Sequence, residues 1–369
     1  MIKVRLVSLI RSRASWAHVA RKLCEAMQQM GVLVMIEEDD DGIIDSQLDI
    51  GEGVKRALNT RFPDPDVDLL IVRPERFQHY GKAPVRTAYM VFEADRWPED
   101  WVSLGTKNLE LVLTPSTFCR DGLIASGMPG DQIAILPHGV DPAFFGPMPP
   151  RCDDGAFRIL FVGTPSRRKG ATQLLDAFQS DRLDHRRLSL TIKTEKLAHR
   201  YEIRDALGPR IAAVRALGAR VTLIEDLYSE QEMARLYGSH DVLCSPHMGE
   251  GFGLCALEAM ACGRPIVATA WSGICDFFDR DAGWPITDFD MIDTDLPLPA
   301  TFPAPSGARM VSPGIPAIAA GLNDAATASK AELEARGRAA ASKASTYSWA
   351  CIAERYLGHI SGLTDRRHP

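Results

Sequence analysis

Short apolar runs typical of β-strands alternate with segments of helical spacing along almost the whole chain. Ile2 to Ile10 is apolar with β-branched residues, whereas Trp16 to Met30 places apolar side chains at steps of three and four. Further strand-like runs occur at 67–72, 86–92 and 109–113, and again at 157–162, 188–193 and 241–244. This rhythm predicts α/β domains with parallel sheets, because helices connect successive parallel strands.

A stretch rich in Pro, Gly and Asp, residues 142–155, interrupts this rhythm near the middle of the chain. Pro and Gly break regular elements, so the stretch predicts a linker. A length of 369 residues also favours two domains over one. We expect an N-terminal domain over 1–145 and a C-terminal domain over 156–345, with ligands bound where the strands of such open sheets end.

Composition narrows the class of partner and the compartment. The formal net charge of −6 and the pI near 5.9 argue against a nucleic-acid backbone as the main partner. The first residues indicate a strand rather than a signal peptide, and no run reaches the roughly 18 apolar residues of a membrane-spanning helix. The eight cysteines show no metal-ligand spacing. We therefore expect a reduced, cytoplasmic protein; peripheral contact with a membrane stays open.

A glycine-rich turn, residues 249–253, lies between an expected strand that ends near Cys244 and an expected helix that begins near Leu254. Gly251 and Gly253 lack a Cβ, so a ligand can approach the backbone closely there. The amides of the first helical turn and the positive end of the helix dipole suit an anion such as a phosphate. The pattern therefore indicates a site for a phosphorylated ligand.

Two glutamates, Glu250 in the turn and Glu258 on the helix, lie eight positions apart. Carboxylates accept hydrogen bonds from sugar hydroxyls, so one could hold a transferred sugar and the other a ribose. On spacing alone, a tight turn with a solvated Glu250 and a partly exposed Glu258 on the helix is an equal alternative. The wording is more specific: Glu-Gly-Phe-Gly-Leu-x-x-Leu-Glu-Ala-Met-Ala-Cys-Gly-x-Pro strongly resembles the Glu-x7-Glu signature of retaining GT-B glycosyltransferases.

The resemblance is close over roughly residues 133–280 and loose elsewhere. It includes the strand before the motif at 236–246, a strand and basic loop at 161–170, and the His-Gly-Val-Asp turn at 138–141. It implies two Rossmann-like domains facing across a cleft, with a C-terminal helix at about 349–369 that crosses back to the first domain. It also implies transfer of a sugar from a nucleotide-diphosphate sugar to a hydroxyl, with retention of the anomeric configuration.

The resemblance assigns donor-site residues one by one. Glu250 is expected to contact the sugar hydroxyls, Glu258 the ribose, and Lys169 the diphosphate. Arg168, or Arg167, is expected to supply a second positive charge, because the position directly after the loop glycine holds Thr164. The further donor-binding candidates are Gly163, Thr164, Lys193, Gly251, Phe252, Gly253 and Leu254.

These cations fit the reaction, because the departing nucleoside diphosphate gains negative charge as the glycosidic bond breaks. Preorganised cations and amides aimed at that charge lower the barrier. Asp-x-Asp sequences of the kind that binds metals occur at 64–68, 288–290 and 293–295, and we interpret all of them as solvated loop carboxylates. We therefore expect metal independence and no cofactor besides the nucleotide-sugar co-substrate.

The N-terminal domain is expected to bind the acceptor, a hydroxyl of a saccharide, a lipid-linked glycan or a small molecule. Arg11 and Arg13 follow the first strand and could meet an acceptor phosphate or the diphosphate. The alternative is a capped helix start, with Ser12 or Ser15 as N-cap and exposed arginines. Glu93 follows the fourth strand and could accept a hydrogen bond from the acceptor hydroxyl.

Two other functions remain open on the sequence alone. A sugar-nucleotide epimerase of the same architecture would isomerise the donor in the absence of an acceptor. A non-catalytic module would bind the sugar nucleotide without turnover, and the absence of a histidine in the loop after the fourth strand keeps that reading open. The donor's base and sugar, the acceptor and the linkage cannot be derived from these residues.

Overall fold

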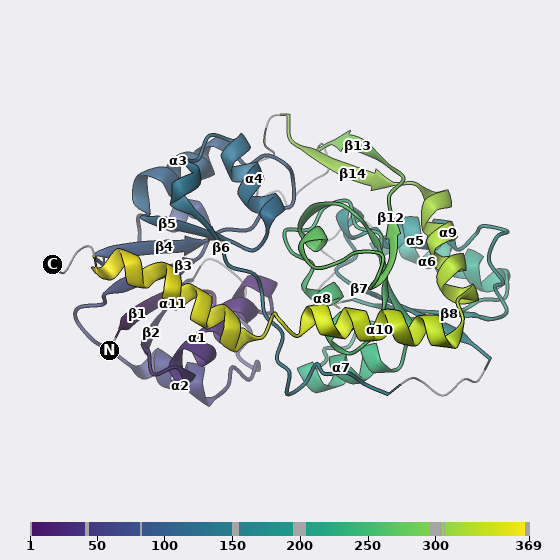
Figure 1. Cartoon of the computed structure of the whole chain (residues 1–369), viewed down its shortest axis with the longest axis horizontal. Helices are drawn as coiled ribbons and strands as arrows, with labels where there is room; N and C mark the ends of the chain where they lie inside the picture. Colours follow the sequence, from purple (N-terminus) through teal and green to yellow (C-terminus); the bar gives the residue numbers. More distant parts are fainter. Residues whose placement is uncertain are drawn as a thin grey trace. The chain divides into compact units, whose positions relative to one another are not determined.

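The computed structural model describes residues 2–40, 44–81, 83–149, 155–194, 204–294, 305 and 307–365. The chain forms two compact units (Figure 1). The first unit comprises Met1–Gly139 together with Tyr347–Pro369, and the second comprises Val140–Thr346. The C-terminal segment therefore belongs to the same unit as the N-terminus.

The first unit is built on a six-stranded sheet with the strand order β2-β1-β3-β4-β5-β6. Each neighbouring pair runs parallel. The strands are β1 (Lys3–Ser8), β2 (Leu33–Glu38), β3 (Val67–Ile71), β4 (Val85–Tyr89), β5 (Leu111–Thr114) and β6 (Ile133–Ile135). The helices are α1 (Ser15–Gln29), α2 (Glu52–Asn59), α3 (Glu99–Asn108), α4 (Thr117–Ala125) and α11 (Trp349–Asp365).

The C-terminal helix α11 packs on the first unit beside α1 (Figure 1). Its apolar face joins the same buried cluster as the strands, with Trp349, Ile352 and Tyr356 among its members. The Tyr356 hydroxyl also lies 3.2 Å from the Thr87 hydroxyl on β4. The expected return of the C-terminal helix to the first domain is thus confirmed.

The second unit contains another six-stranded sheet, in the order β12-β11-β10-β7-β8-β9, and each neighbouring pair again runs parallel. Its strands are β7 (Phe157–Val162), β8 (Leu188–Lys193), β9 (Arg220–Ile224), β10 (Val242–Ser245), β11 (Ile266–Thr269) and β12 (Gly283–Ile286). The strand order reverses between β7 and β10. The expected fold, two Rossmann-like α/β domains, is confirmed.

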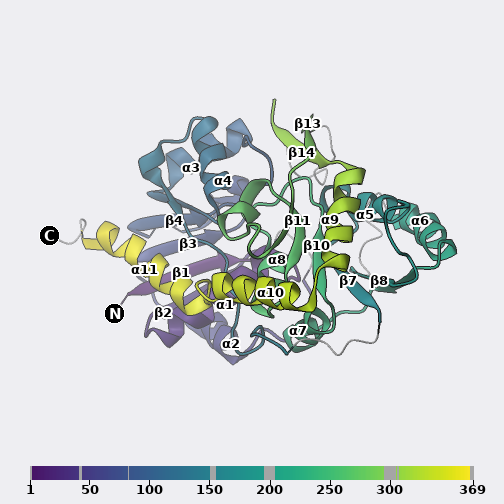
Figure 2. The same cartoon turned by 45° about the vertical axis from the view of Figure 1, so that its right-hand side comes forward.

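Helices cover both faces of the second sheet. The helices are α5 (Ala171–Ala177), α6 (Arg204–Ala216), α7 (Glu230–Gly238), α8 (Leu254–Ala261), α9 (Ile315–Thr327) and α10 (Lys330–Ala344). α5 packs against α6 and α9, and α9 contacts β11 and β12, whereas α8 packs against α7 and α10 (Figure 2). The turn that links β10 to α8 therefore leads into a helix, α8, that is held between α7 and α10.

Several elements differ from the sequence-based expectation. Helices α2 and α3 and strand β12 were not predicted. The acidic residues 288–290 and Asp293 were interpreted as loop, but β13 (Phe289–Asp293) pairs antiparallel with β14 (Arg309–Pro313). The residues of β14 that pair with β13 include Met310 and Val311, and both are buried. Asp295 and most of the Pro-rich stretch 297–307 lie outside the described residues.

The start of α1 also differs from the alternative considered for Arg11 and Arg13. Ala14, not Ser12 or Ser15, occupies the N-cap position of α1, and no side-chain hydrogen bond caps the helix. Ser12 instead accepts a hydrogen bond from the Ala14 amide at 3.3 Å. The loop after β1 is therefore held not by a helix cap but by bonds to other segments, such as that from the Arg11 amide to Glu38 at 3.0 Å.

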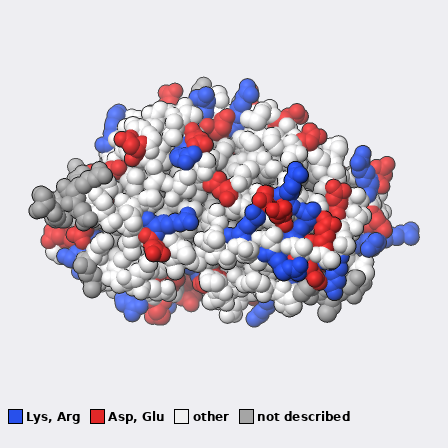
Figure 3. Space-filling model, in the orientation of Figure 1, with Lys and Arg blue, Asp and Glu red and all other residues white. Residues whose placement is uncertain are grey.

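The surface charge is mixed. Figure 3 shows Lys and Arg interspersed with Asp and Glu on the face that it draws. Charges of alternating sign produce no broad field of one sign there. Within the described residues, no helix is both long enough and apolar enough to span a membrane.

Candidate functional site

Two loops of the second unit follow adjacent strands where the strand order reverses. β7 continues into residues 163–170, and its neighbour β10 continues into residues 246–253. In open α/β sheets, ligands bind outside the C-terminal strand ends at such a reversal. The basic loop and the glycine-rich turn singled out from the sequence therefore share the position where this fold favours a ligand.

Gly170 allows the basic loop to pack closely against the loop that follows β10. It follows the 3₁₀ turn η3 (Arg167–Lys169) and has φ 82°, which is the left-handed region that favours glycine. A Cβ at this position would overlap the carbonyl oxygen of Pro246. The Met248 amide also donates a hydrogen bond to the Arg168 carbonyl at 2.8 Å. The two loops are thus held in contact through their backbones.

Glu250 is the meeting point of the charged side chains. It is 8% exposed, and its Oε1 lies 2.5 Å from the Lys169 Nζ. Arg168 donates to the Gly249 carbonyl at 2.6 Å and lies 3.5 Å from the Glu250 Oε2. Burial acts to raise the pKa of Glu250, but the charges of Lys169 and Arg168 outweigh it and lower the pKa to about 2. Glu250 is therefore ionised between two cations at neutral pH.

The backbone of Glu250 is held by the 3₁₀ turn η5 (Ser272–Asp276). The Glu250 amide donates to the Ser272 hydroxyl at 3.0 Å, and the Gly273 amide donates to the Glu250 carbonyl at 2.9 Å. Ser272 has φ 69°, in a region where non-glycine residues are strained. A Cβ on Gly273 would overlap the Gly251 carbonyl. Sequence analysis named neither Ser272 nor Gly273, and the strained serine lies at the site itself.

The residues after Glu250 lead directly into helix α8. Gly253 is the N-cap, with φ 99° and no side-chain cap. The amides of a first helical turn have no intrahelical acceptor, so the start of α8 offers donors to an anion. Phe252 points into the protein, where its ring lies 5.1 Å from that of Phe277. Of the expected donor residues 251–254, Phe252 can thus offer its backbone but not its ring.

Glu258 lies about one helical turn after the start of α8 and is half-buried. The Tyr237 hydroxyl of α7 donates a hydrogen bond to its Oε2 at 2.7 Å. Sequence analysis did not single out Tyr237. No spacing rule could have identified it, because the contact depends on how α7 and α8 pack.

Lys193 and Gly163 lie together at the same end of the sheet. The Gly163 amide donates to the Lys193 carbonyl at 3.1 Å, and the Lys169 side chain passes within 3.4 Å of the position that a Cβ on Gly163 would take. Lys193 is 6% exposed, and its Nζ donates to the Thr194 carbonyl at 2.9 Å. The Nζ also lies 5.2 Å from the centre of the Tyr228 ring, within the range of a cation–π contact.

The expected acceptor residues lie in the first unit, where the two arginines pair with nearby carboxylates. Arg11 pairs with Glu38, and Arg13 lies 2.6 Å from Asp45. Arg11 also lines a cavity of about 510 Å³. Glu93 is half-buried in the segment after β4. The structure thus places Arg11 and Arg13 in one loop and Glu93 in another.

The described residues contain no group of three or more His, Cys, Asp or Glu side chains that could hold a metal ion. The Asp-x-Asp sequence at 64–68 is part of the framework of the first unit. Asp66 accepts a hydrogen bond from the Lys3 amide at 2.8 Å, and Asp68 lies 2.8 Å from Arg5. These carboxylates hold β1 and β3 together rather than forming the solvated loop that we expected.

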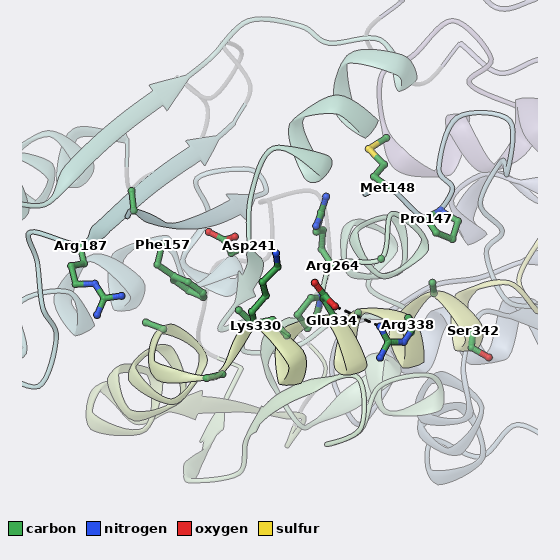
Figure 4. Close-up of a pocket in the computed structure, with 18 of the residues that line it drawn as sticks. Pro147, Met148, Phe157, Arg187, Asp241, Arg264, Lys330, Glu334, Arg338 and Ser342 are labelled. Carbon is green, nitrogen blue, oxygen red and sulfur yellow. Dashed lines mark ion pairs between the residues drawn. The ribbon is translucent and has the colours of Figure 1, made fainter. Parts of the chain in front are cut away.

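A cavity of about 800 Å³ lies at the opposite end of the second sheet (Figure 4). Phe157 at the start of β7, Asp241 before β10 and Pro265 before β11 line one side, and α10 lines the other. On α10, Arg338 and Glu334 form an ion pair at 3.9 Å. This cavity does not coincide with the candidate site, because Lys169 and Glu250 follow the C-terminal strand ends.

Two Rossmann-like units, with a C-terminal helix returned to the first, are the architecture of the GT-B fold. Residues 156–293 match the sequence model of the family described as glycosyl transferases group 1. This match contains the basic loop, the glycine-rich turn, α8 and η5, so it covers the whole site described in the second unit.

Among characterised proteins, the chain is similar to D-inositol 3-phosphate glycosyltransferase of Pseudarthrobacter chlorophenolicus. The two are 30% identical over 171 residues, which is 44% of this chain and 40% of that protein. The match thus spans less than half the length of this relative.

Solved structures match over nearly the whole chain at low identity. Sucrose-phosphate synthase from Thermosynechococcus elongatus aligns with a TM-score of 0.72 at 17% identity, over 99% of this chain and 100% of that one. HepE of Anabaena, solved in complex with UDP-glucose, aligns with a TM-score of 0.70 at 12% identity, over 98% and 100%. These likenesses establish the fold.

Proposed function

We propose that this chain is a retaining, metal-independent glycosyltransferase that moves a sugar from a nucleotide-diphosphate sugar to an acceptor hydroxyl. The observation that carries the proposal is the contact of Lys169 and Arg168 with Glu250 beside the start of α8. Cations, amides and a sugar-binding carboxylate meet there within a domain that matches glycosyl transferases group 1. The cytoplasmic location remains part of the proposal.

In this proposal the diphosphate rests on the first-turn amides of α8, opposite Lys169 and Arg168. Cations and amides fixed in advance stabilise the charge that develops on the leaving diphosphate without reorganising. Removing one such donor typically costs about 2.7–4 kcal/mol of barrier. Glu250 accepts hydrogen bonds from the hydroxyls of the transferred sugar, and Glu258 from those of the ribose.

Retention and metal independence are supported by different arguments. Retention rests on the resemblance of the 250–269 segment to the Glu-x7-Glu signature. Metal independence rests on Lys169 and Arg168, because positive side chains can perform the electrostatic work of a metal on a diphosphate. HepE of Anabaena, a structural neighbour, was solved with UDP-glucose and with UDP, so UDP-sugars are the first donors to try.

The acceptor side is proposed to lie in the first unit. Arg11 and Glu38 form an ion pair, and both residues line the cavity of about 510 Å³ there. With Arg13 and Glu93, Arg11 is the proposed contact for the acceptor. The acceptor itself is proposed only as a hydroxyl of a saccharide, a lipid-linked glycan or a small molecule.

The test is to replace Lys169 and Glu250 by alanine, one at a time. Each change is expected to lower kcat by about 10²–10³ or more, while thermal unfolding stays cooperative. Release of nucleoside diphosphate and the anomeric configuration of the product are measured with and without EDTA, after a thermal-shift screen of UDP, GDP, ADP, CMP and dTDP sugars.

A matched control is Lys343→Ala, because Lys343 forms an exposed ion pair with Asp279 at 2.8 Å in the same unit. It is expected to keep wild-type turnover. Wild-type rates in Lys169→Ala or Glu250→Ala would contradict the site assignment. Isomerised donor formed without any acceptor would instead indicate an epimerase.

A further inference from the structure

Helix α7 presents a buried tyrosine to the second glutamate of the site. The Tyr237 hydroxyl lies 2.7 Å from the Glu258 Oε2, and the Tyr237 residue is 1% exposed. Neither the transfer step nor the diphosphate site described above uses this hydroxyl. A hydrogen bond to an ionised group is shorter and roughly twice as strong as one between neutral groups. The contact therefore restricts where the Glu258 carboxyl group can lie.

The end of α7 is held in place from several sides. Arg264 donates to the Gly238 carbonyl at 2.8 Å, and its own amide donates to the Ala259 carbonyl of α8 at 3.0 Å. A Cβ on Gly238 would overlap the Met148 sulfur. These contacts join the C-terminal ends of α7 and α8. The position of Tyr237, one residue before Gly238, is therefore set by the fold.

The tyrosine ring is fixed as well as its backbone. Phe145 meets it edge-on, with the ring centres 6.2 Å apart. Burial raises the pKa of Tyr237 well above its ordinary value, so the hydroxyl stays protonated and donates to Glu258. An ionised carboxylate has about four acceptor positions, so a bond from Tyr237 leaves Glu258 able to accept more.

We infer that Tyr237 is a positioning residue that aims the Glu258 carboxylate at the ribose of the nucleotide. The inference rests on the proposed function, in which Glu258 binds that ribose. Tyr237 itself touches neither the sugar nor the diphosphate in this arrangement. Its consequence is selectivity: the hydroxyl of Tyr237 sets how strongly the site prefers a ribonucleotide over its 2′-deoxy counterpart.

A purely structural tyrosine gives a different expectation. The hydroxyl could instead serve only to satisfy a polar group between α7 and α8. Its removal would then lower the stability of the protein and reduce the affinities for the ribonucleotide and the deoxyribonucleotide to the same extent. A positioning role weakens binding of the ribonucleotide more than binding of its 2′-deoxy counterpart, because the 2′-deoxy compound lacks one of the hydroxyls that Glu258 would accept from. The ratio of the two affinities therefore separates the two roles.

The experiment measures binding of UDP and dUDP, with the GDP–dGDP and ADP–dADP pairs, to the full chain by calorimetry. Wild type is expected to bind the ribonucleotide at least about tenfold more tightly, the effect of a hydrogen bond to a charged group. Tyr237→Phe keeps the ring and is expected to reduce that preference to about threefold or less. With the ribonucleotide donor, KM should rise while kcat stays near the wild-type value. This pattern is expected when the lost interaction is equally strong in the bound substrate and in the transition state.

The matched control is Tyr356→Phe, which removes another buried hydroxyl, bonded to Thr87 in the first unit. It is expected to keep the wild-type preference. An unchanged preference in Tyr237→Phe overturns the inference. If Tyr237→Phe does not fold, Glu258→Asp, one methylene shorter, replaces it as the test, and a wild-type preference there also overturns the inference.

Glu258→Gln separates this inference from the proposed function. If wild type and Glu258→Gln both lack a preference for the ribonucleotide, the ribose role of Glu258 is wrong, and the inference fails with it. If Glu258→Gln loses the preference but Tyr237→Phe retains it, only the inference fails. Adding Tyr237→Phe to Glu258→Gln should cause no further loss of preference, because the tyrosine acts through the glutamate.

Discussion

At the scale of single residues, Lys169 has two possible partners. In the free protein it lies 2.5 Å from Glu250, whose pKa is lowered to about 2. In the proposed complex the diphosphate brings a second anion to the same ammonium group. A nucleoside diphosphate without a sugar must therefore compete with Glu250, whereas a sugar nucleotide engages both the cation and the carboxylate.

This competition predicts opposite effects of Glu250→Gln on binding and on transfer. The neutral amide leaves Lys169 and Arg168 without their anionic partner, so UDP should bind about 5- to 30-fold more tightly, the equivalent of ~1–2 kcal/mol. Transfer should fall by about 10²-fold or more, because the sugar loses its charged acceptor. Calorimetry with UDP and turnover with the sugar nucleotide measure the two effects.

Asp279→Asn is the control for that prediction, because it deprives Lys343 of a carboxylate at 2.8 Å elsewhere in the same unit. It should change neither quantity. Weaker UDP binding in Glu250→Gln than in wild type would show that Glu250 does not compete with the diphosphate for Lys169.

The charged residues of the candidate site could be predicted from the sequence, but the residues that hold them in place could not. The amino-acid sequences of the two segments that contain Glu250, Lys169 and Arg168 are specific enough to identify these residues. Ser272 and Tyr237 could not be identified in this way, because each bonds to a glutamate more than 20 positions away through packing of separate elements. Spacing rules reach only neighbours within one helix or strand.

At the scale of elements, the strand–loop–helix units were predictable and their exceptions have physical causes. Inner strands such as β5 and β11 are buried at every residue and thus form near-continuous apolar runs. Helix α2 has eight residues, too few for helical spacing to stand out. Strand β13 shows no regular alternation of apolar and polar residues, because Asp290 and Asp293 lie three positions apart and therefore on opposite faces of the strand.

The contact of the basic loop with the glycine-rich turn yields a prediction about Gly170. Gly170→Ala introduces a Cβ at φ 82° that overlaps the Pro246 carbonyl. It should lower the free energy of unfolding by about 2 kcal/mol or more, from strain and steric overlap together. Because the loop carrying Lys169 must shift, the affinity for UDP should fall as well.

Gly218→Ala is the matched control. Gly218 also has a positive φ, 101°, but no backbone atom lies near the position of its Cβ. It should cost about 1 kcal/mol from strain alone and leave UDP affinity at the wild-type value. Equal affinities in Gly170→Ala and wild type, measured by calorimetry beside thermal unfolding, would show that the loop contact does not support binding.

At the scale of the whole molecule, the number and class of domains were predictable, but the order of strands was not. The alternation of elements implies parallel sheets, whereas the neighbours of each strand are set by packing. The order β12-β11-β10-β7-β8-β9 is what places β7 beside β10 and their two loops at one reversal. The return of α11 to the first unit was expected only through the family resemblance.

The central claim is that a diphosphate binds between Lys169 and the start of α8. The most direct test is a crystal structure of the full chain with UDP, or with the nucleoside diphosphate that the thermal-shift screen selects. The account predicts the Lys169 Nζ within about 3 Å of a phosphate oxygen, with amides at the start of α8 donating to the same group. A diphosphate bound elsewhere, as in the cavity beside α10, with Lys169 still on Glu250, would contradict it.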